Sequence, residues 1–510
     1  MSRSSLDDLS VLPTDSDHDH DHGYQTDTTS PPPSDTHTDD PPCAPSDYRL
    51  HQFRQREYPQ LDGRVYLDHA GTTLYSRSLI QAFSADLQTH LYGNPHSASS
   101  PSTTSTAHVD SVRAAALAFF HADPRHWDLV FVANATAAIR LVAHAFRDAV
   151  RPTNSRWWYG YHRDAHTSLV GVRECADQSR CFGGNDEVER WLDMGGIGGA
   201  RARELALFAW PGQSNMTGRR LPLDWPRRIR KFHKSPTYTL LDAAALASTA
   251  PIDLSDHDAA PDFVALSFYK IFGFPNLGAL LVRKASAAPL LTRGYFGGGT
   301  VDMVIAVQDT WHASKDASIH DRLEDGTLPF HAIFALGHAL AVHERLYGPD
   351  PMAAISRHTA RLTARLHAAL VALRHPAPRA TPLVRIYTDA SSVPGDPSTH
   401  GATLAFNVLD PAGRPFAYHT VEAAADARRI HLRSGSLCNP GGLAVHLDWS
   451  PADMRAAYAH GHRCSRPTAL VGGKATGVVR ASLGAMSSVA DVDALVAFLR
   501  DTYLGVDAPE

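Results

Sequence analysis

Short apolar runs alternate with helical stretches along the middle of the chain, from residue 128 onward. The runs of strand length are Leu129–Val132, Trp157–Tyr161, Leu205–Ala209, Thr237–Leu241 and Asp262–Leu266. Apolar residues at helical spacing follow several of them, most clearly at Ala137–Ala149. This alternation predicts an α/β fold with a mainly parallel sheet covered by helices on both faces. In such sheets ligands bind beyond the carboxyl ends of the strands, so polar residues that follow the strands are the candidates for a site.

The two ends of the chain show different patterns. Residues 1–46 are rich in Asp, Ser, Thr, Pro and His without apolar periodicity, which predicts a disordered tail. Its segment His18–His22 fits a solvated polar tract better than a metal site, because nothing nearby would fix a coordination geometry. After residue 348 a long helical stretch, Ile355–Leu373, precedes short strands and a final helix, Val489–Tyr503. We therefore expect a large domain at 47–348 and a smaller α+β domain at 349–510, with some N-terminal residues packed on the smaller one.

Composition narrows the class of protein. The chain has 510 residues, 43% hydrophobic and 20% charged, which is typical of a soluble globular protein with more than one structural unit. A net charge of −5 gives no reason to expect nucleic acid or an anionic membrane as a partner. No apolar stretch is long enough to cross a bilayer, and no apolar signal core follows the first residues. Since the five cysteines form no disulfide or zinc pattern, we expect a cytoplasmic protein with no bound metal.

Lys270 is the residue around which the predicted site is organised. The chain contains six lysines, and only Lys270 lies in an apolar-aromatic run, Ser267–Gly273, directly after a predicted buried strand. A lysine desolvated in this way can act as an amine nucleophile, although taken alone it could simply cover apolar surface with its aliphatic stem. Asp242 ends the preceding predicted strand and offers the acid that the pyridine nitrogen of pyridoxal phosphate (PLP) requires. Together, Lys270 and Asp242 predict a PLP site.

Several longer motifs resemble a known family. They are Tyr66–Gly71, Tyr92–Ser97, Ser267–Pro275, Tyr295–Thr300 and Arg322–Thr327. These motifs resemble the amino-terminal, NifS-like domain of molybdenum cofactor sulfurases, within the class V aminotransferase group of fold type I PLP enzymes. The resemblance covers about Tyr48 to Leu504. It implies a PLP-dependent cysteine desulfurase that works as a homodimer, with active sites near the subunit interface.

Cofactor-binding candidates lie in the loops after the strands. Thr136, before a predicted helix, offers a hydroxyl and nearby N–H groups to the PLP phosphate, with an ordinary helix cap as the alternative. Ser267 is a second phosphate candidate and Thr300 a third, which the resemblance places in the neighbouring subunit. Tyr269, beside Lys270, belongs to the same set.

Two further loop residues would contact the cofactor ring. His166 would stack on the pyridine ring and move protons, whereas a lone loop histidine is otherwise a surface residue. Asn215 would hydrogen-bond the phenolic oxygen of PLP, with turn chemistry as the alternative.

Arg433 and Cys438 supply the second half of the predicted chemistry. Arg433, after a short strand, can direct two hydrogen bonds onto a substrate α-carboxylate, although an isolated arginine is more often in a surface ion pair. Cysteines are usually buried and inert, but Gly435, Asn439 and Gly441 around Cys438 argue against burial. In desulfurases that this sequence resembles, an arginine and a cysteine five residues apart bind the carboxylate and take the sulfur.

The predicted function is therefore transfer of sulfur from L-cysteine to Cys438 as a persulfide, with release of alanine and delivery of the sulfur to an acceptor protein or cofactor. A PLP aminotransferase or C–S lyase for another amino acid would use Lys270, Asp242 and Arg433 but not Cys438. A non-catalytic binding protein with a PLP-enzyme fold is a third class. Because the chain ends soon after Leu504, we expect it to lack the further C-terminal domain of the full-length sulfurases it resembles, and it has Ser436 and Gly442 where that family often has more cysteines.

Overall fold

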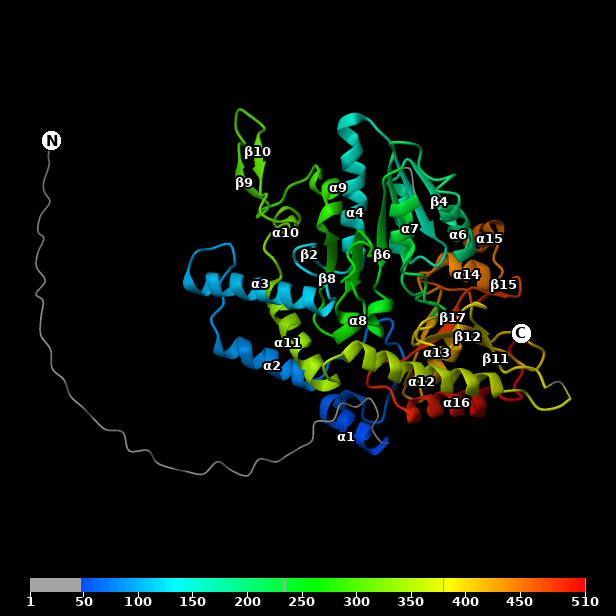
Figure 1. The fold of residues 1–510 in the computed structure, drawn as a ribbon. Helices are drawn as coiled ribbons and strands as arrows, with labels where there is room; N and C mark the ends of the chain where they lie inside the picture. The colour runs from blue at the N-terminus through cyan, green and yellow to red at the C-terminus, as the bar shows by residue number, and fades with distance from the viewer. Residues whose placement is uncertain (1–46, 233–234, 379, 510) are drawn as a thin grey trace, which may run out of the picture. The chain divides into compact units, whose positions relative to one another are not determined.

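A seven-stranded sheet contains all the strands predicted for the middle of the chain (Figure 1). The computed structural model describes residues 47–232, 235–378 and 380–509, so the predicted tail and its His18–His22 segment lie outside the described residues. The strands, in spatial order, are β2 (Trp127–Val132), β8 (Gly278–Arg283), β7 (Phe263–Ser267), β6 (Thr237–Asp242), β5 (Leu205–Pro211), β3 (Trp157–His162) and β4 (Gln178–Phe182). Strands β7, β6, β5, β3 and β4 pair in parallel, while β8 runs antiparallel to both of its neighbours. The predicted mainly parallel α/β fold is confirmed.

The central strands are apolar throughout because both faces of the sheet are covered. Along β5, Phe208 and Trp210 enter one hydrophobic core, while Leu207 and Ala209 enter the core on the opposite face. Successive side chains of a strand point to opposite faces, so burial on both sides produces a continuous apolar run rather than an alternating one.

Helices from separate parts of the chain form these two layers. Residues of α1 (Asp47–Glu57), α2 (Arg77–Thr89), α3 (Ser100–Phe119), α6 (Asn185–Asp193), α7 (Trp225–Phe232) and α11 (Phe330–Tyr347) belong to the first core. Residues of α4 (Ala135–Val150), α5 (Thr167–Val170), α9 (Ala288–Leu291) and α10 (Ile319–Leu323) belong to the second. The alternation of strand and helix is interrupted once, because the link from β6 to β7 contains only a short 3-10 turn at Leu246–Ser248.

A second, antiparallel sheet of four strands has its own core. Its strands, in spatial order, are β11 (Val384–Tyr387), β12 (Thr403–Val408), β17 (Val478–Ser482) and β14 (Arg433–Gly435). Residues of α12 (Pro351–Ala372), α13 (Tyr418–Asp426) and α16 (Val489–Tyr503) pack against this sheet, and α14 (Pro440–His446) and α15 (Pro451–Ala459) lie between β14 and β17 in the sequence. An N-terminal strand, β1 (Val65–Tyr66), pairs in parallel with β13 (Ile430–His431), and Leu67 lies in the core of this sheet. N-terminal residues therefore pack with the C-terminal part of the chain.

A hairpin of β9 (Val301–Val304) and β10 (His312–Ser314) extends away from the sheets (Figure 1). Its exposed side chains include Met303, Val304, Val307 and Trp311. Separately, no helix in the described part of the chain combines the length and the apolar character needed to cross a membrane.

Candidate active site

Lys270 and Asp242 line the same pocket at the carboxyl edge of the large sheet. Strands β6 and β7 are parallel neighbours, with Asp242 opposite Ala265, so both strands end at this edge. Lys270 follows β7 on a single turn, α8 (Tyr269–Phe272). That turn ends at Gly273, whose φ is 78° and where an added Cβ would collide with the backbone of Leu74 and Tyr75. About 550 Å³ of space in and in front of the pocket is free of protein atoms, part of it open to solvent.

The electrostatic surroundings of Lys270 suit a nucleophilic amine. Burial lowers the pKa of Lys270 and is the largest influence on it. The carboxylates of Asp242 and Asp68 act in the opposite direction, while Arg480 and Arg433 lower the pKa further. A lowered pKa makes the neutral amine, which is the nucleophilic form, more accessible near neutral pH.

His166 lines the pocket as the residue that precedes α5. The backbone N–H of Ser168 donates a hydrogen bond of 3.1 Å to Nδ1 of His166. Nδ1 is therefore an acceptor, and the neutral ring carries its proton on Nε2. Burial lowers the pKa of His166, with an opposing effect from Asp242. His166 is thus a neutral imidazole with one transferable proton beside Lys270 and Asp242.

The start of α4 and the end of β7 form a cradle for an anion. Asn134 caps α4 by accepting a hydrogen bond of 3.0 Å from the N–H of Ala137, so Thr136 does not serve as the helix cap. Thr136 lines the pocket, and its hydroxyl lies 2.7 Å from that of Ser168. The buried Ser267 hydroxyl accepts a hydrogen bond of 2.9 Å from the N–H of Ala135. Hydroxyls beside the N-terminus of a 16-residue helix form the arrangement that binds a phosphate.

The exposed thiol of Cys438 sits on a backbone that is joined to the pocket at two points. The N–H of Thr167, next to His166, donates to the Cys438 carbonyl at 2.9 Å. The Asn215 amide, which lines the pocket, donates to the Leu437 carbonyl at 2.7 Å. The exposure expected for Cys438 is confirmed.

Asn215 is engaged more extensively than the sequence suggested. Besides its bond to Leu437, its side-chain oxygen accepts a hydrogen bond of 3.0 Å from Asn439. Its backbone carbonyl accepts one of 3.0 Å from Arg480. Asn215 therefore links the pocket to the segment that follows Cys438.

Arg433 shares its carboxylate partner with a second arginine that the sequence analysis did not select. The Nε atom of Arg433 lies 3.5 Å from Asp68, and half of the side chain, 52%, is exposed. Arg480, in β17, has only 2% of its side chain exposed and donates to the other oxygen of Asp68 at 2.6 Å. Its Nε atom has no hydrogen-bond partner among the described residues. An arginine within the apolar run Val478–Ser482 was the available signal for a buried functional cation.

Thr300 is the one predicted cofactor ligand that lies elsewhere. Its hydroxyl donates to the carbonyl of Gly297 at 2.8 Å within its own loop. It lines a separate pocket at the base of the β9–β10 hairpin, together with Arg293 and His312. Within one chain, the structure brings together Lys270 and Asp242 with the other pocket candidates, which are His166, Asn215, Thr136, Ser267 and Tyr269.

This donor set fits PLP. It offers an amine for the cofactor's aldehyde, an acid for the ring nitrogen, a neutral imidazole and a phosphate cradle. The described residues contain no cluster of three or more His, Cys, Asp or Glu side chains suited to a metal ion. The fold and the site define a PLP-dependent enzyme.

The chain belongs to the aminotransferase class-V family, whose model matches residues 65–495. The resemblance inferred from the motifs is confirmed, and the cofactor is pyridoxal phosphate. The chain is 53% identical over 456 residues to a molybdenum cofactor sulfurase of Aspergillus niger, a match that covers 89% of this chain and 54% of the relative. A relative of the same name from Botryotinia fuckeliana is 49% identical, with 89% of this chain and 55% of the relative covered. The chain thus spans about half the length of the curated relatives it matches.

The fold is also similar to solved structures. The apo cysteine desulfurase of Thermococcus onnurineus superposes with a TM-score of 0.68 at 18% identity, covering 89% of this chain and 98% of that one. These comparisons support the fold assigned above.

Proposed function

We propose that the chain is a cysteine desulfurase, which transfers sulfur from L-cysteine to Cys438 and releases alanine. The observation that supports this most directly is the placement of Cys438. Cys438 is exposed, and its backbone segment accepts hydrogen bonds from Thr167, the neighbour of His166, and from Asn215, which lines the pocket together with Lys270. A PLP aminotransferase would need no thiol at this position.

The residues of the pocket divide the work of such a reaction. Bound PLP supplies an electron sink for the substrate's α-carbon. Lys270 holds the cofactor and then moves a proton at that carbon, while Asp242 keeps the pyridine nitrogen protonated. His166 donates or accepts a proton at Nε2. The Cys438 thiolate attacks the substrate sulfur, so that an S–S bond forms, the C–S bond breaks and its electron pair remains with the carbon fragment, which is protonated to alanine.

Binding of the cofactor and the substrate uses the remaining candidates. Thr136 and Ser267 bind the phosphate at the start of α4, and Asn215 and Tyr269 complete the contacts to PLP. Arg433 binds the substrate carboxylate through the two parallel donors of its guanidinium group.

We further propose a homodimer. The β9–β10 hairpin exposes Met303, Val307 and Trp311, with 61%, 76% and 49% of their surface accessible. Contiguous exposed apolar side chains on a protruding element are typical of an interaction surface. Thr300, at the base of this hairpin, would then reach the phosphate of the neighbouring subunit.

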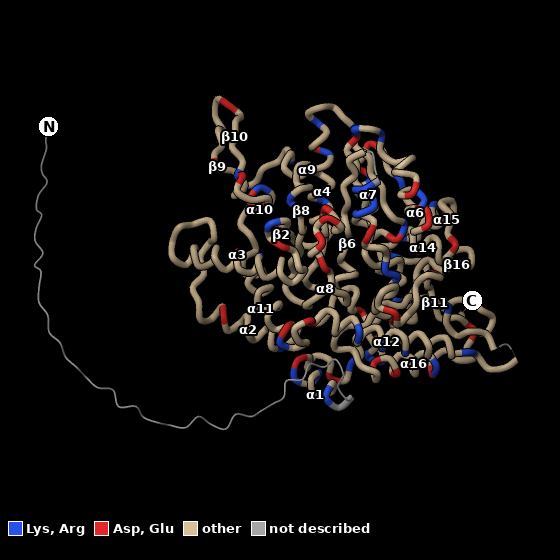
Figure 2. Tube along the Cα trace, viewed as in Figure 1, with Lys and Arg blue, Asp and Glu red and all other residues tan. Residues whose placement is uncertain are grey.

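The remaining assignments are proposals of the same kind. Figure 2 shows Lys and Arg interspersed with Asp and Glu along the described chain, and the net charge is −5, so we propose neither nucleic acid nor an anionic membrane as a partner. We propose a cytoplasmic location, a PLP-binding domain at 47–348 and a smaller domain at 349–510, because each of the two sheets has its own core. The sulfur acceptor is a protein or a cofactor, and the relatives' name points to molybdenum cofactor.

Incubation of the purified protein with L-cysteine tests the proposal. We expect alanine in amounts equal to the sulfur transferred, and a mass increase of one sulfur atom on the peptide that contains Cys438. Pyruvate with free sulfide and an unmodified Cys438 would identify a C–S lyase instead. A keto acid formed from another amino acid would identify an aminotransferase.

A further inference from the structure

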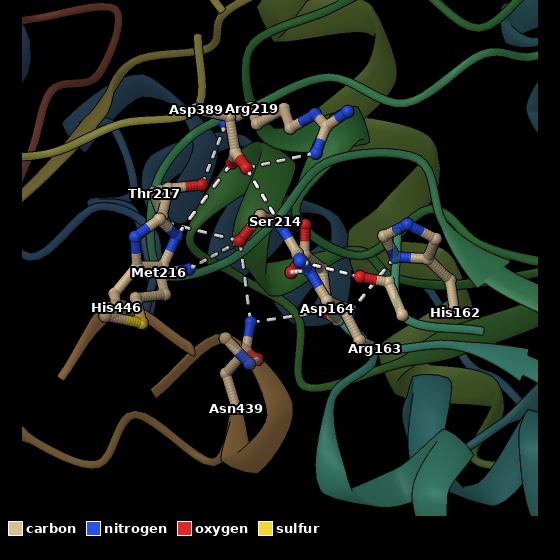
Figure 3. A network of polar contacts seen from close by, with 12 residues as sticks. His162, Arg163, Asp164, Ser214, Met216, Thr217, Arg219, Asp389, Asn439 and His446 are labelled. Atoms are coloured by element: carbon tan, nitrogen blue, oxygen red, sulfur yellow. Dashed lines mark hydrogen bonds and ion pairs between the residues drawn. The ribbon is translucent and has the colours of Figure 1, made fainter. Parts of the chain in front are cut away.

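A network of ion pairs centres on Asp389, in the loop after β11 (Figure 3). One oxygen of Asp389 lies 3.1 Å from the guanidinium group of Arg163 and 3.1 Å from that of Arg219. All three side chains are largely shielded from solvent, with 11%, 20% and 9% of their surface exposed. The network carries no cofactor candidate and lies outside the pocket described above.

Each arginine belongs to a loop that also carries a pocket residue. Arg163 stands between the end of β3 and His166, and Arg219 follows β5 a few residues after Asn215. Asp389 therefore joins the smaller sheet to the two strand-end loops of the larger one. A buried carboxylate between two guanidinium groups is a stiff link, because removing the carboxylate leaves both buried cations without the partner they share.

The helix that follows Cys438 is hydrogen-bonded beside this network at its start and lies against it at its end. At its start, the Asn439 side chain caps α14 through the N–H of Gly442 and donates to the Asp164 carbonyl at 3.1 Å. At its end, His446 Nε2 lies 3.9 Å from the second oxygen of Asp389. That oxygen and the His446 nitrogen are both buried and have no hydrogen-bond partner among the described residues.

The body of α14 also lies close to the Arg163 loop. An added Cβ at Gly441 would collide with the carbonyl of Arg163, so only glycine permits this approach. The helix is thus held at its start and its middle against the loop that carries His166, while its last residue, His446, faces Asp389.

From this arrangement we infer that Asp389 is a positioning residue for Cys438. Asp389 aligns α14 against the loops that carry His166 and Asn215. The thiol of Cys438 is aligned with the helix, because Cys438 directly precedes Asn439, the residue that caps α14. The inference rests on the proposed function in one respect, namely that Cys438 is the sulfur acceptor. A displacement of about 1 Å in a reacting group can lower a rate roughly 100-fold, so this alignment is sufficient to control sulfur transfer.

Asp389→Ala tests the inference, with Asp389→Glu as the conservative rescue. Asp493→Ala is the matched control, because Asp493 is a half-exposed carboxylate that pairs with Arg365. His446→Leu is the milder variant, since it changes only the contact at the end of α14 and leaves both Asp389 ion pairs in place. For PLP-loaded protein we expect Asp389→Ala to slow the appearance of sulfur on Cys438 by about 10- to 100-fold. KM for L-cysteine and PLP content should stay within about twofold of wild type, with partial recovery in the Glu variant.

Amide hydrogen exchange gives a readout that does not depend on activity. In Asp389→Ala, and more weakly in His446→Leu, we expect faster exchange across α14 and at Thr167, whose N–H binds the Cys438 carbonyl. The control should leave both unchanged. The inference would be overturned if amide exchange across α14 and at Thr167 were unchanged in both Asp389→Ala and His446→Leu. It would also be overturned if the slower sulfur transfer in Asp389→Ala were fully explained by loss of PLP or by a lower Tm. If the wild-type protein puts no sulfur on Cys438, the proposed function fails, while the exchange data still decide whether Asp389 holds α14.

Discussion

Arg433 and Arg480 share Asp68 but should respond very differently to substitution. Arg433 is half exposed and has one contact of 3.5 Å with Asp68, so Arg433→Ala should change the free energy of unfolding by less than about 1 kcal/mol. Hydrogen bonds from a charged group contribute about 1.5–3 kcal/mol each. Arg433→Ala removes two such interactions with the substrate carboxylate, about 3 kcal/mol or more, and should lower kcat/KM for L-cysteine by at least about 150-fold, mainly through KM.

Arg480→Ala should act on stability instead. It removes a buried cation that donates to Asp68 at 2.6 Å and to the Asn215 carbonyl at 3.0 Å, with an expected cost of about 3–5 kcal/mol. The assay is steady-state alanine formation on PLP-loaded variants, with urea unfolding of each and Arg433→Lys as the charge-preserving control. Two results together would refute the assignment of Arg433 to the substrate carboxylate. They are wild-type kinetics for Arg433→Ala and a large rise in KM for a folded Arg480→Lys variant, and they would make Arg480 the carboxylate ligand.

Three further predictions concern the thiol, the packing of α14 and acid stability. Cys438→Ser should abolish the persulfide and leave the visible absorbance of bound PLP unchanged; a persulfide elsewhere in this variant would contradict the role of Cys438. Gly441→Ala should slow sulfur transfer at unchanged PLP content, because its Cβ would strike the Arg163 carbonyl, and a wild-type rate would argue against that close approach. Burial lowers the pKa of His343 to about 3, so below pH 6.5 the unfolded chain binds this proton and the folded chain does not. The free energy of unfolding should therefore fall as the pH decreases, by about 1.4 kcal/mol per pH unit from this residue. In urea unfolding, the free energy should fall less steeply with decreasing pH for His343→Phe than for wild type. An unchanged pH dependence would show that His343 does not cause the loss of stability in acid.

The strands that form the site were predictable because both faces of the large sheet are buried. Continuous apolar runs such as Leu205–Ala209 have few alternative structures, and the polar residue after each run marks the edge where ligands bind. Asp242 and Lys270 follow neighbouring strands, so their meeting in one pocket followed from the topology. Strand β4, by contrast, has alternating exposed and half-buried residues at the sheet edge, which gives a weak apolar signal.

The contacts of the Cys438 segment could not be predicted in the same way. Asn439 acts through Asp164 and Asn215, residues that are more than 200 positions away in the sequence. The Asp389 ion pairs likewise join three loops whose spacing in the chain carries no periodic signal. Such contacts depend on how the two sheets pack, which local patterns of apolar and polar residues do not encode.

The central claim is that Lys270 holds PLP covalently, with Asp242 at the other end of the ring. The most direct test is borohydride reduction of the PLP-loaded protein, followed by peptide mass spectrometry. We predict that the reduced cofactor is found on Lys270 and that Lys270→Ala retains no covalent label. A label on another lysine, or none on the wild-type protein, would contradict the account.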